Sequence, residues 1–281
     1  MSYVPYGDDW TKKTINGIDV WIPPEGYVYD PVSKRMVFID VEGDGRPRDE
    51  QYWRRPTLPR DYSRRVAEMD RQRRHTPHYV DPVVASIRKR EWLRRLGGYW
   101  FMNNGVPVYI TGLHYFFLTY YRLDIGYPDF RITDRELLLM WDSIVDDPYC
   151  MGLLMLTRRR YGKTFIGGAI LLEYITRAWR AYGGIQSKDD YTAKRAFVNA
   201  VRMPFRNLPD FFRPNVDNRV VSRLVIEESG SEVDYRAVGE TAYDGTKLHR
   251  YVSDEFGKTV GANIVTRHNV IKYCLMDPPN I

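Results

Sequence analysis

The tripeptide Gly-Lys-Thr occurs twice in this chain, at 162–164 and at 257–259. It ends the loop that cradles phosphate groups in many nucleotide-binding proteins, where the lysine reaches the β- and γ-phosphates and the hydroxyl contacts Mg²⁺. Such a loop follows a strand and opens a helix, because consecutive backbone N–H groups and the positive end of the helix dipole hold the phosphates. The residues around each copy decide which of them could bind a nucleotide.

The first copy has both flanking elements. The apolar run GLLML at 152–156 predicts a buried strand, and the apolar segment from Lys163 predicts a long helix. The loop departs from the pattern G-x-x-x-x-G-K-[ST] at its first position, and three consecutive arginines add positive charge. The predicted nucleotide-binding residues are Thr157, Arg158, Arg159, Arg160, Tyr161, Gly162, Lys163 and Thr164.

The second copy follows two carboxylates, Asp254 and Glu255, which would repel phosphate oxygens. The preceding β-prone run LHRYVS, 248–253, predicts a core strand that carries both carboxylates at its C-terminal end. At that position Asp254 could hold Mg²⁺ through water, and Glu255 could orient or deprotonate the attacking water. On this interpretation the second Gly-Lys-Thr is incidental.

The two motifs are more specific together than apart, since Gly-Lys-Thr alone occurs by chance and Asp-Glu alone is usually surface charge. Asp254 follows Lys163 by 91 residues, in the order that a nucleotide-hydrolysing domain requires. The prediction is an α/β P-loop NTPase of the ASCE type with a doubly wound, mainly parallel sheet. The alternative is a coincidental loop in an unrelated α/β domain.

Other elements complete the predicted organisation. Helices are expected at 131–147 and 190–201, a strand at GGIQS, 183–187, and a hairpin from RLVIEE and EVDYRAVGE across Ser-Gly-Ser. Short strands are expected within 15–40, a linker at 41–60 and a helix from Asp81 to about Leu96. We expect three regions: 1–80 with strands and a basic linker as an α+β extension, 81–128 as a helical and aromatic subregion, and 129–281 as the core.

Composition narrows the class of protein. The chain has 281 residues, of which 43% are hydrophobic and 28% charged, which is typical of a globular protein. We expect an intracellular protein, because the N-terminus lacks the apolar core of a signal peptide and only two cysteines occur. The segment 46–97 carries 15 Arg and Lys against 7 Asp and Glu. This excess fits either a polyanion-binding surface or a solvated helix face.

The motif residues resemble the large terminase subunit of tailed bacteriophages, the motor that packages DNA into the procapsid. TRRRYGKT, 157–164, is similar to that family's variant phosphate loop, in which an arginine stands three positions before the glycine. YVSDEFGK, 251–258, resembles its second nucleotide motif. YRAVGETAYDG and YITGLHYFFLTYYRLD add softer similarity, so that the resemblance extends from about Trp92 onward.

The resemblance implies roles for individual residues. Lys163 would grip the β- and γ-phosphates of ATP, Thr164 and Asp254 would hold Mg²⁺, and Glu255 would be the catalytic carboxylate. Arg159 would stabilise charge on the transferred phosphate, whereas Arg158 and Arg160 are interpreted as solvated or DNA-facing. The family's adenine-side motif is not clear here. Arg131 and Asp134 are weak candidates for it, and a helix cap at Thr133 or Asp134 is the preferred interpretation.

The resemblance also implies partners: double-stranded DNA, the portal protein, the small terminase subunit and further copies in a ring on the procapsid, in the host bacterial cytoplasm and without a membrane. The chain ends at Ile281, before the family's coupling motif and its nuclease domain. We therefore expect a fragment or one half of a split protein, an incomplete core without nuclease activity.

Two other functions stay open. A superfamily-2-like helicase or remodelling ATPase shares the strand order and the Asp-Glu pair. A nucleotide-binding assembly module without turnover is the non-enzymatic alternative. His249 is interpreted as a sheet residue with a satisfied side chain, and Tyr115, Phe116 and Phe117 as core residues.

Overall fold

The computed structural model describes residues 11–15, 18–22, 27–30, 35–38, 53–103, 106–145, 147, 149–150, 152–217, 220–236, 238–259 and 261–275. The chain forms two compact units, one of Met1–Thr119 with Asp129–Asp147 and one of Tyr120–Pro128 with Pro148–Ile281. The segment 129–147, which the sequence places in the core, thus belongs to the first unit. Among the described residues, no helix combines the length and apolarity needed to cross a membrane.

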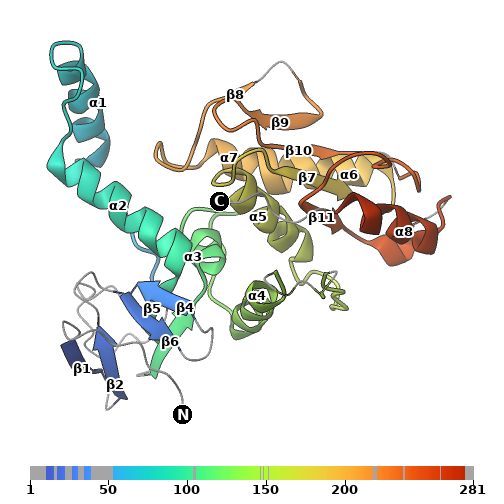
Figure 1. The fold of residues 1–281 in the computed structure, drawn as a ribbon, viewed down its shortest axis with the longest axis horizontal. Coiled ribbons are helices and arrows are strands. Elements are labelled where there is room, and N and C mark those ends of the chain that lie inside the picture. Colours follow the sequence, from blue (N-terminus) through green and yellow to red (C-terminus); the bar gives the residue numbers. More distant parts are fainter. Residues whose placement is uncertain are drawn as a thin grey trace. The chain divides into compact units, whose positions relative to one another are not determined.

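In its described residues, the first unit contains three antiparallel strand pairs and four helices (Figure 1). The elements are β1 (Thr11–Ile15), β2 (Ile18–Ile22), β3 (Tyr27–Asp30), β4 (Arg35–Phe38), α1 (Tyr62–Arg73), α2 (Pro82–Gly97), β5 (Tyr99–Asn103), β6 (Val106–Ile110), α3 (Gly112–Thr119) and α4 (Ile132–Val145). The strands within 15–40 and the helix from Asp81 are confirmed, and Asp81 caps α2 by accepting from Val83 N and Val84 N. Helix α1 was not predicted. Residues 41–52 of the predicted linker lie outside the described residues.

The core of the first unit is aromatic. Tyr115, Phe116 and Phe117 on α3 are buried, which confirms their interpretation as core residues. Glu91 and Arg94 are also buried, one turn apart on α2, and form an ion pair with N–O distance 3.0 Å. The Tyr115 hydroxyl hydrogen-bonds to the same Glu91 carboxylate. Burying these charges is tolerated because each has a close partner, and removing one partner would leave an unpaired buried charge.

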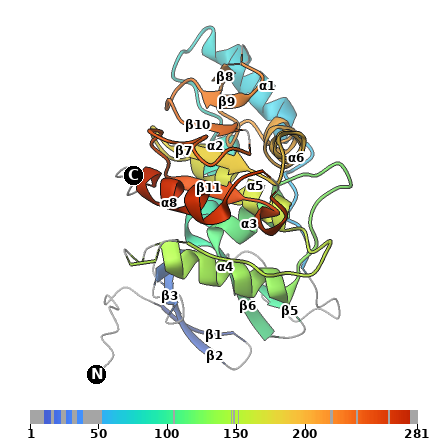
Figure 2. The same cartoon turned by 90° about the vertical axis from the view of Figure 1, so that its right-hand side faces the viewer.

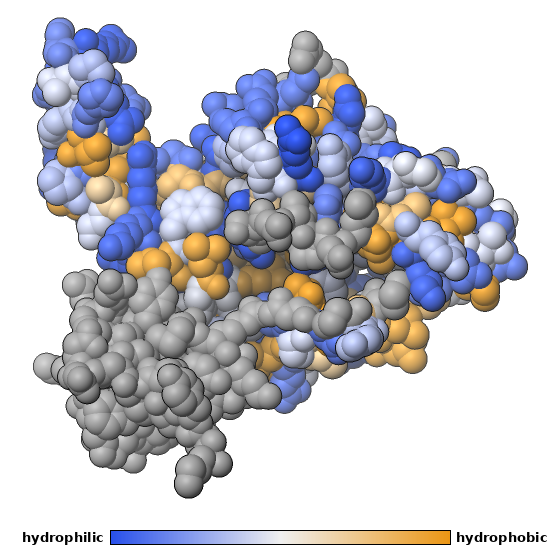
Figure 3. Space-filling view, viewed as in Figure 1, coloured by the Kyte–Doolittle hydropathy of each residue, from blue (hydrophilic) through white to orange (hydrophobic). Residues whose placement is uncertain are grey.

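The described part of the basic stretch, 53–97, forms several ion pairs inside this unit. Arg65 lies 2.6 Å from Asp61, Arg71 lies 2.8 Å from Glu68, and Arg94 pairs with Glu91. Figure 3 shows a mostly hydrophilic surface over α1. These contacts favour the interpretation of this stretch as a solvated helix face and internal ion pairs rather than as a dedicated polyanion site.

The second unit is built on a five-stranded sheet in the order β11-β7-β10-β9-β8. Its elements are α5 (Lys163–Ile175), β7 (Tyr182–Gln186), α6 (Asp190–Phe197), the π-helical turn η1 (Val198–Arg202), α7 (Met203–Arg206), β8 (Val216–Asp217), β9 (Arg223–Ile226), β10 (Glu232–Tyr235), β11 (Arg250–Ser253), the 3₁₀ turn η2 (Phe256–Lys258) and α8 (Ile264–Cys274). The predicted hairpin β9–β10 is confirmed, as are the strands β7 and β11. The sheet is mixed rather than mainly parallel, because β7 pairs in parallel with β10 and β11 while β9 pairs antiparallel with β10 and β8.

Helices cover both faces of this sheet, as the two glycines in the centre of β7 show. A Cβ on Gly183 would meet Leu171 of α5 at 3.0 Å, whereas a Cβ on Gly184 would meet the Tyr243 ring at 2.7 Å. Successive strand residues point to opposite faces, so α5 and Tyr243 lie on opposite sides. Tyr243 packs with Ile271 and Cys274 of α8. Figure 2 shows the sheet with α5 and α8 from a second side.

The prediction of a strand at 152–156 is wrong. These residues pair with no strand in the described part of the chain, and Leu154 and Leu156 are 65% and 88% exposed. The edge strand β11 pairs only with β7 among the described residues. An apolar run becomes a buried strand only where neighbouring strands supply hydrogen-bond partners and cover its side chains, and here it has neither.

Candidate nucleotide-binding site

Helix α5 begins at Lys163 without a side-chain cap. Its N-cap residue is Gly162, which adopts the left-handed conformation with φ 97° and offers no acceptor for the first turn. Glycine suits this position because a Cβ disfavours that backbone conformation. The first N–H groups of a helix have no intrahelical partner. The start of α5 therefore presents donors and a positive dipole end to an external anion.

A cavity of about 410 Å³ lies at this helix start. Every residue that the sequence predicts to bind a nucleotide lines it: Thr157, Arg158, Arg159, Arg160, Tyr161, Gly162, Lys163 and Thr164. Phe165, Glu255 and Lys258 complete the lining. The loop thus surrounds a space next to its lysine, although the strand expected before it does not form.

Thr164 and Asp254 meet beside this cavity. Thr164 Oγ1 donates to Asp254 Oδ2 at 2.6 Å. Asp254 is 6% exposed and directly follows β11, where its backbone N–H donates to Gln186 O and continues the β7 ladder. The strand pairing therefore fixes the carboxylate at the helix start. The structure brings together the two residues predicted as metal contacts.

Close packing holds α5 against β11. A Cβ on Gly167 would lie 2.9 Å from Val252 Cγ1, and a Cβ on Gly168 would lie 2.3 Å from Ala200 O of η1. Real Cβ atoms do not approach other atoms so closely. The two glycines let α5 contact β11 on one side and η1 on the other. This packing sets the distance between Thr164, one turn earlier on α5, and Asp254.

Glu255 lies in the cavity wall in an unusual backbone conformation. Its φ is 49°, and Arg160, also in the lining, has φ 63°. Among the described residues other than glycine, Arg180 is the one further residue with a positive φ. Such strain persists where the surroundings impose it and gathers at functional sites.

Two lysines hold the Glu255 carboxylate. Lys258 Nζ lies 3.2 Å from Oε1, and Lys188 Nζ lies 3.4 Å from Oε2. Partial burial raises the pKa of Glu255, but the hydrogen bonds and charges of Lys258 and Lys188 outweigh it, so the net pKa is lowered from its ordinary value. Both oxygens of the predicted catalytic group thus have a cationic partner.

These two lysines were not among the predicted site residues. Lys258 belongs to the second Gly-Lys-Thr and lies three residues after Glu255. That spacing could have predicted their contact, because a 3₁₀ turn brings residues three positions apart together. Lys188 follows β7, and only the β7–β11 pairing places it beside Glu255. Its proximity has no signal in a single sequence.

Other predicted residues have structural partners. His249 Nδ1 accepts from Tyr182 N at 3.0 Å, which confirms its interpretation as a satisfied sheet residue. Arg131 holds the buried Asp134 carboxylate through two hydrogen bonds of 2.7 and 2.8 Å. In the described part of the chain no capping bond from Thr133 or Asp134 is found, so the ion pair takes the place of the expected cap. Both Arg131 and Asp134 belong to the first unit.

The residues present fit Mg²⁺ and phosphate. Magnesium takes oxygen ligands and commonly uses one or two protein groups together with waters and substrate phosphates. Thr164 and Asp254 supply such oxygens. Thr157 Oγ1, also in the lining, is buried and lacks a hydrogen-bond partner among the described residues. Among the described residues, no group of three or more His, Cys, Asp or Glu able to hold a metal is found.

The comparison with known proteins leaves the family open. A scan against protein-family models finds no match to this chain, and no curated protein is significantly similar to it. The case for a function therefore rests on the residues and geometry of the cavity.

Proposed function

We propose that the second unit binds ATP with Mg²⁺ and hydrolyses it, as the motor domain of a machine of the large-terminase type. The observation that carries the proposal is the contact of Thr164 Oγ1 with Asp254 Oδ2 at 2.6 Å beside a cavity lined by Lys163 and Glu255. Residues far apart in sequence thus supply a phosphate-binding cation, two oxygen ligands and a carboxylate around one space.

Each group has a distinct task. Lys163 and the first N–H groups of α5 bind the phosphates. The lysine carries a positive charge, and the N–H groups are hydrogen-bond donors at the positive end of the helix dipole. Thr164 and Asp254 hold the Mg²⁺, which when bound neutralises charge on the phosphate oxygens. Glu255 orients the attacking water and accepts its proton, and Arg159 stabilises the charge that develops during transfer.

The motor assignment extends beyond the chemistry of the cavity. It is supported by the resemblance of 157–164 and 251–258 to the terminase motifs. Under this proposal the ATPase drives double-stranded DNA into a procapsid in the host bacterial cytoplasm. Its partners are the portal protein, the small terminase subunit and further copies of itself in a ring.

One observation favours a second candidate, a nucleotide-binding assembly module without turnover. Both Glu255 oxygens are paired with lysines in this structure. Two ammonium partners lower the proton affinity of this carboxylate, so it becomes an effective acceptor for a proton of the attacking water once one lysine leaves. If neither lysine leaves when nucleotide binds, the chain binds ATP and does not hydrolyse it.

The test is Mg²⁺-dependent ATP hydrolysis by this chain, with and without double-stranded DNA, beside direct ATP binding. Lys163→Ala should abolish binding and turnover, and Glu255→Gln should abolish turnover while binding persists. Stimulation by double-stranded DNA without strand separation would support the packaging motor over a helicase. ATP binding without turnover would favour the assembly module. Absence of both would refute the proposed function.

A further inference from the structure

The lysine of the second Gly-Lys-Thr lies in the nucleotide cavity. Lys258 lines the same cavity as Lys163, the lysine of the first copy. The two come from different elements, Lys163 from the start of α5 and Lys258 from η2, directly after Glu255. The sequence motifs predict one lysine, Lys163, at this cavity, and the structure adds Lys258 to its lining.

Lys258 is free to change partners. Its side chain is 65% exposed, and its recorded ion pair is with Glu255 Oε1 at 3.2 Å. Exposed ion pairs of this kind contribute little to stability and exchange readily. Lys188 is less exposed, at 37%, and is not in the cavity lining. Of the two lysines that hold Glu255, Lys258 is therefore the one placed to reach a ligand.

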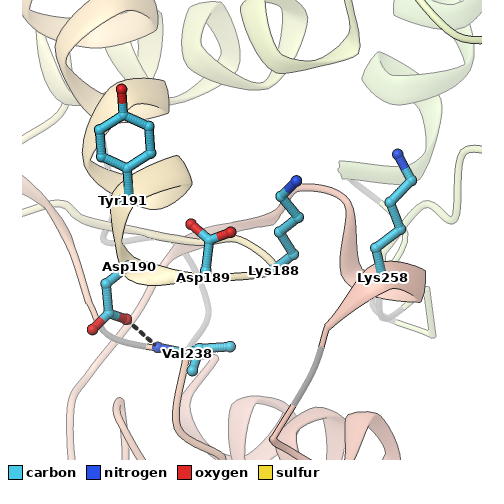
Figure 4. Close-up of a pocket in the computed structure, with 6 residues that line it drawn as sticks. All are labelled: Lys188, Asp189, Asp190, Tyr191, Val238 and Lys258. Atoms are coloured by element: carbon cyan, nitrogen blue, oxygen red, sulfur yellow. Dashed lines mark hydrogen bonds between the residues drawn. The ribbon is translucent and has the colours of Figure 1, made fainter.

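Both lysines that pair with Glu255 also line a neighbouring cavity of about 680 Å³ (Figure 4). Lys188 and Lys258 come from separate segments and lie beside each other with their ammonium ends pointing the same way. The acids of this cavity have other partners. Asp189 accepts from Thr192 N at 2.7 Å, and Asp190 accepts from Val238 N at 2.8 Å. Glu255 is thus the carboxylate for which both lysines are recorded as ion-pair partners.

We propose that Lys258 senses the terminal phosphate of a bound nucleoside triphosphate. In this mechanism, which rests on the proposed function, the terminal phosphate attracts the Lys258 ammonium away from Glu255. Glu255 Oε1 then loses its cationic partner and becomes a stronger acceptor for the attacking water, while Lys188 keeps Oε2 in place. A nucleoside diphosphate lacks the group that draws Lys258 away. The catalytic carboxylate is therefore released when triphosphate is present and held by Lys258 when it is absent.

The experiment compares the equilibrium binding of ATP and ADP, each with Mg²⁺, to four proteins. They are the unsubstituted chain, Lys258→Met, Lys258→Arg and Lys272→Met, the last a charge-matched change at an exposed lysine of α8 away from both cavities. Lys258→Met should weaken ATP binding about tenfold, because a charge-assisted contact to phosphate is lost. ADP binding should stay within about twofold, because Lys258 does not contact it. Lys258→Arg and Lys272→Met should both keep the preference for ATP.

A second measurement separates phosphate sensing from a simple electrostatic effect. Single-turnover hydrolysis at saturating ATP should be retained in Lys258→Met, because Lys258 has already left Glu255 when ATP is bound. A lysine that only stabilised the charge of the transition state would lower this rate when removed. Equal weakening of ATP and ADP by Lys258→Met, or no change in either, would overturn the sensing role while leaving the proposed function in place. Failure of the unsubstituted chain to bind either nucleotide would overturn the proposed function and this inference with it.

Discussion

Thr164 Oγ1 donates a 2.6 Å hydrogen bond to Asp254 Oδ2, joining the first turn of α5 to the end of β11. The two residues are 90 positions apart in sequence. The bond exists because α5 packs on β11 through Gly167, and because β11 extends the sheet beside β7. The pair proposed to hold Mg²⁺ is thus a product of helix–sheet packing rather than of the loop alone.

Thr164→Val should remove Mg²⁺-dependent hydrolysis while the chain stays folded. Valine has nearly the same shape but no hydroxyl, so a metal oxygen is lost and the buried Asp254 carboxylate loses a donor. We expect turnover to fall by about two orders of magnitude, or ~3 kcal/mol, and stability to fall by about 1–3 kcal/mol. Turnover measured against Mg²⁺ concentration checks this.

Thr164→Ser is the matched control, because it keeps the hydroxyl and removes a methyl group. It should keep most of the activity and the ordinary Mg²⁺ dependence. If Thr164→Val retained full activity, the hydroxyl would not be a metal contact and the fit of the cavity to Mg²⁺ would be wrong.

Arg159→Ala should lower the turnover number and leave stability unchanged. Arg158, Arg159 and Arg160 are exposed, and none has a recorded ion pair in the described residues, so truncating one breaks no structural contact. An arginine that stabilises transferred charge accounts for about 10³-fold or more in rate. Arg158→Ala serves as the control and should change turnover only slightly. Comparable losses in both variants would show that the cluster acts through its summed charge.

Gly168→Ala should destabilise the second unit more than Gly167→Ala. The added Cβ at Gly168 would meet the backbone oxygen of Ala200, which cannot move without displacing η1, and we expect a loss of about 2–3 kcal/mol. At Gly167 it would meet the Val252 side chain, and the gain in helix propensity of about 1 kcal/mol offsets much of the clash. Urea unfolding of both variants measures the difference. An equal effect would contradict the close approach of α5 to η1.

Local patterns predicted the elements that depend on local signals. The Ser-Gly-Ser turn between two β-prone runs predicted the β9–β10 hairpin, and Asp81-Pro82 predicted the start of α2, because capping and turn preferences act over a few residues. The run at 152–156 has the composition of a buried strand. Composition cannot show whether neighbouring strands exist to pair with it, and here the prediction failed.

The site was predicted in the same uneven way. Motif spacing put Lys163, Thr164, Asp254 and Glu255 among the predicted site residues, and the structure places the first two and Glu255 around one cavity with Asp254 beside it. Lys188 was missed because its position beside Glu255 depends on strand register. Lys258 was dismissed because the acids before it argued against a phosphate loop of its own. That argument did not consider a lysine that joins the first loop's cavity.

His114 should make the first unit less stable as the pH falls. Its side chain is fully buried on α3 and stacks on Phe130 with ring centroids 5.8 Å apart. Neither ring nitrogen has a hydrogen-bond partner among the described residues. Burial, reinforced by the positive charges of Arg135 and Arg131, lowers the pKa of His114 from 6.5 to about 3. The folded state therefore holds the imidazole neutral.

Because the folded pKa lies below the unfolded one, stability is fully present above about pH 6.5 and is lost as the pH falls toward 3. Between pH 7.5 and pH 5 the loss should be about 2 kcal/mol, since each unit of pH below the unfolded pKa contributes about 1.4 kcal/mol. His114→Leu removes this dependence and should be neutral or slightly stabilising at pH 7.5, because the two unpartnered nitrogens are replaced by apolar atoms. Urea unfolding of both proteins at the two pH values, followed by tryptophan fluorescence, gives the comparison. If the difference in unfolding free energy between the unsubstituted chain and His114→Leu did not change with pH, the imidazole would be hydrated or hydrogen-bonded in solution. The description of His114 as buried without a hydrogen-bond partner would then be wrong.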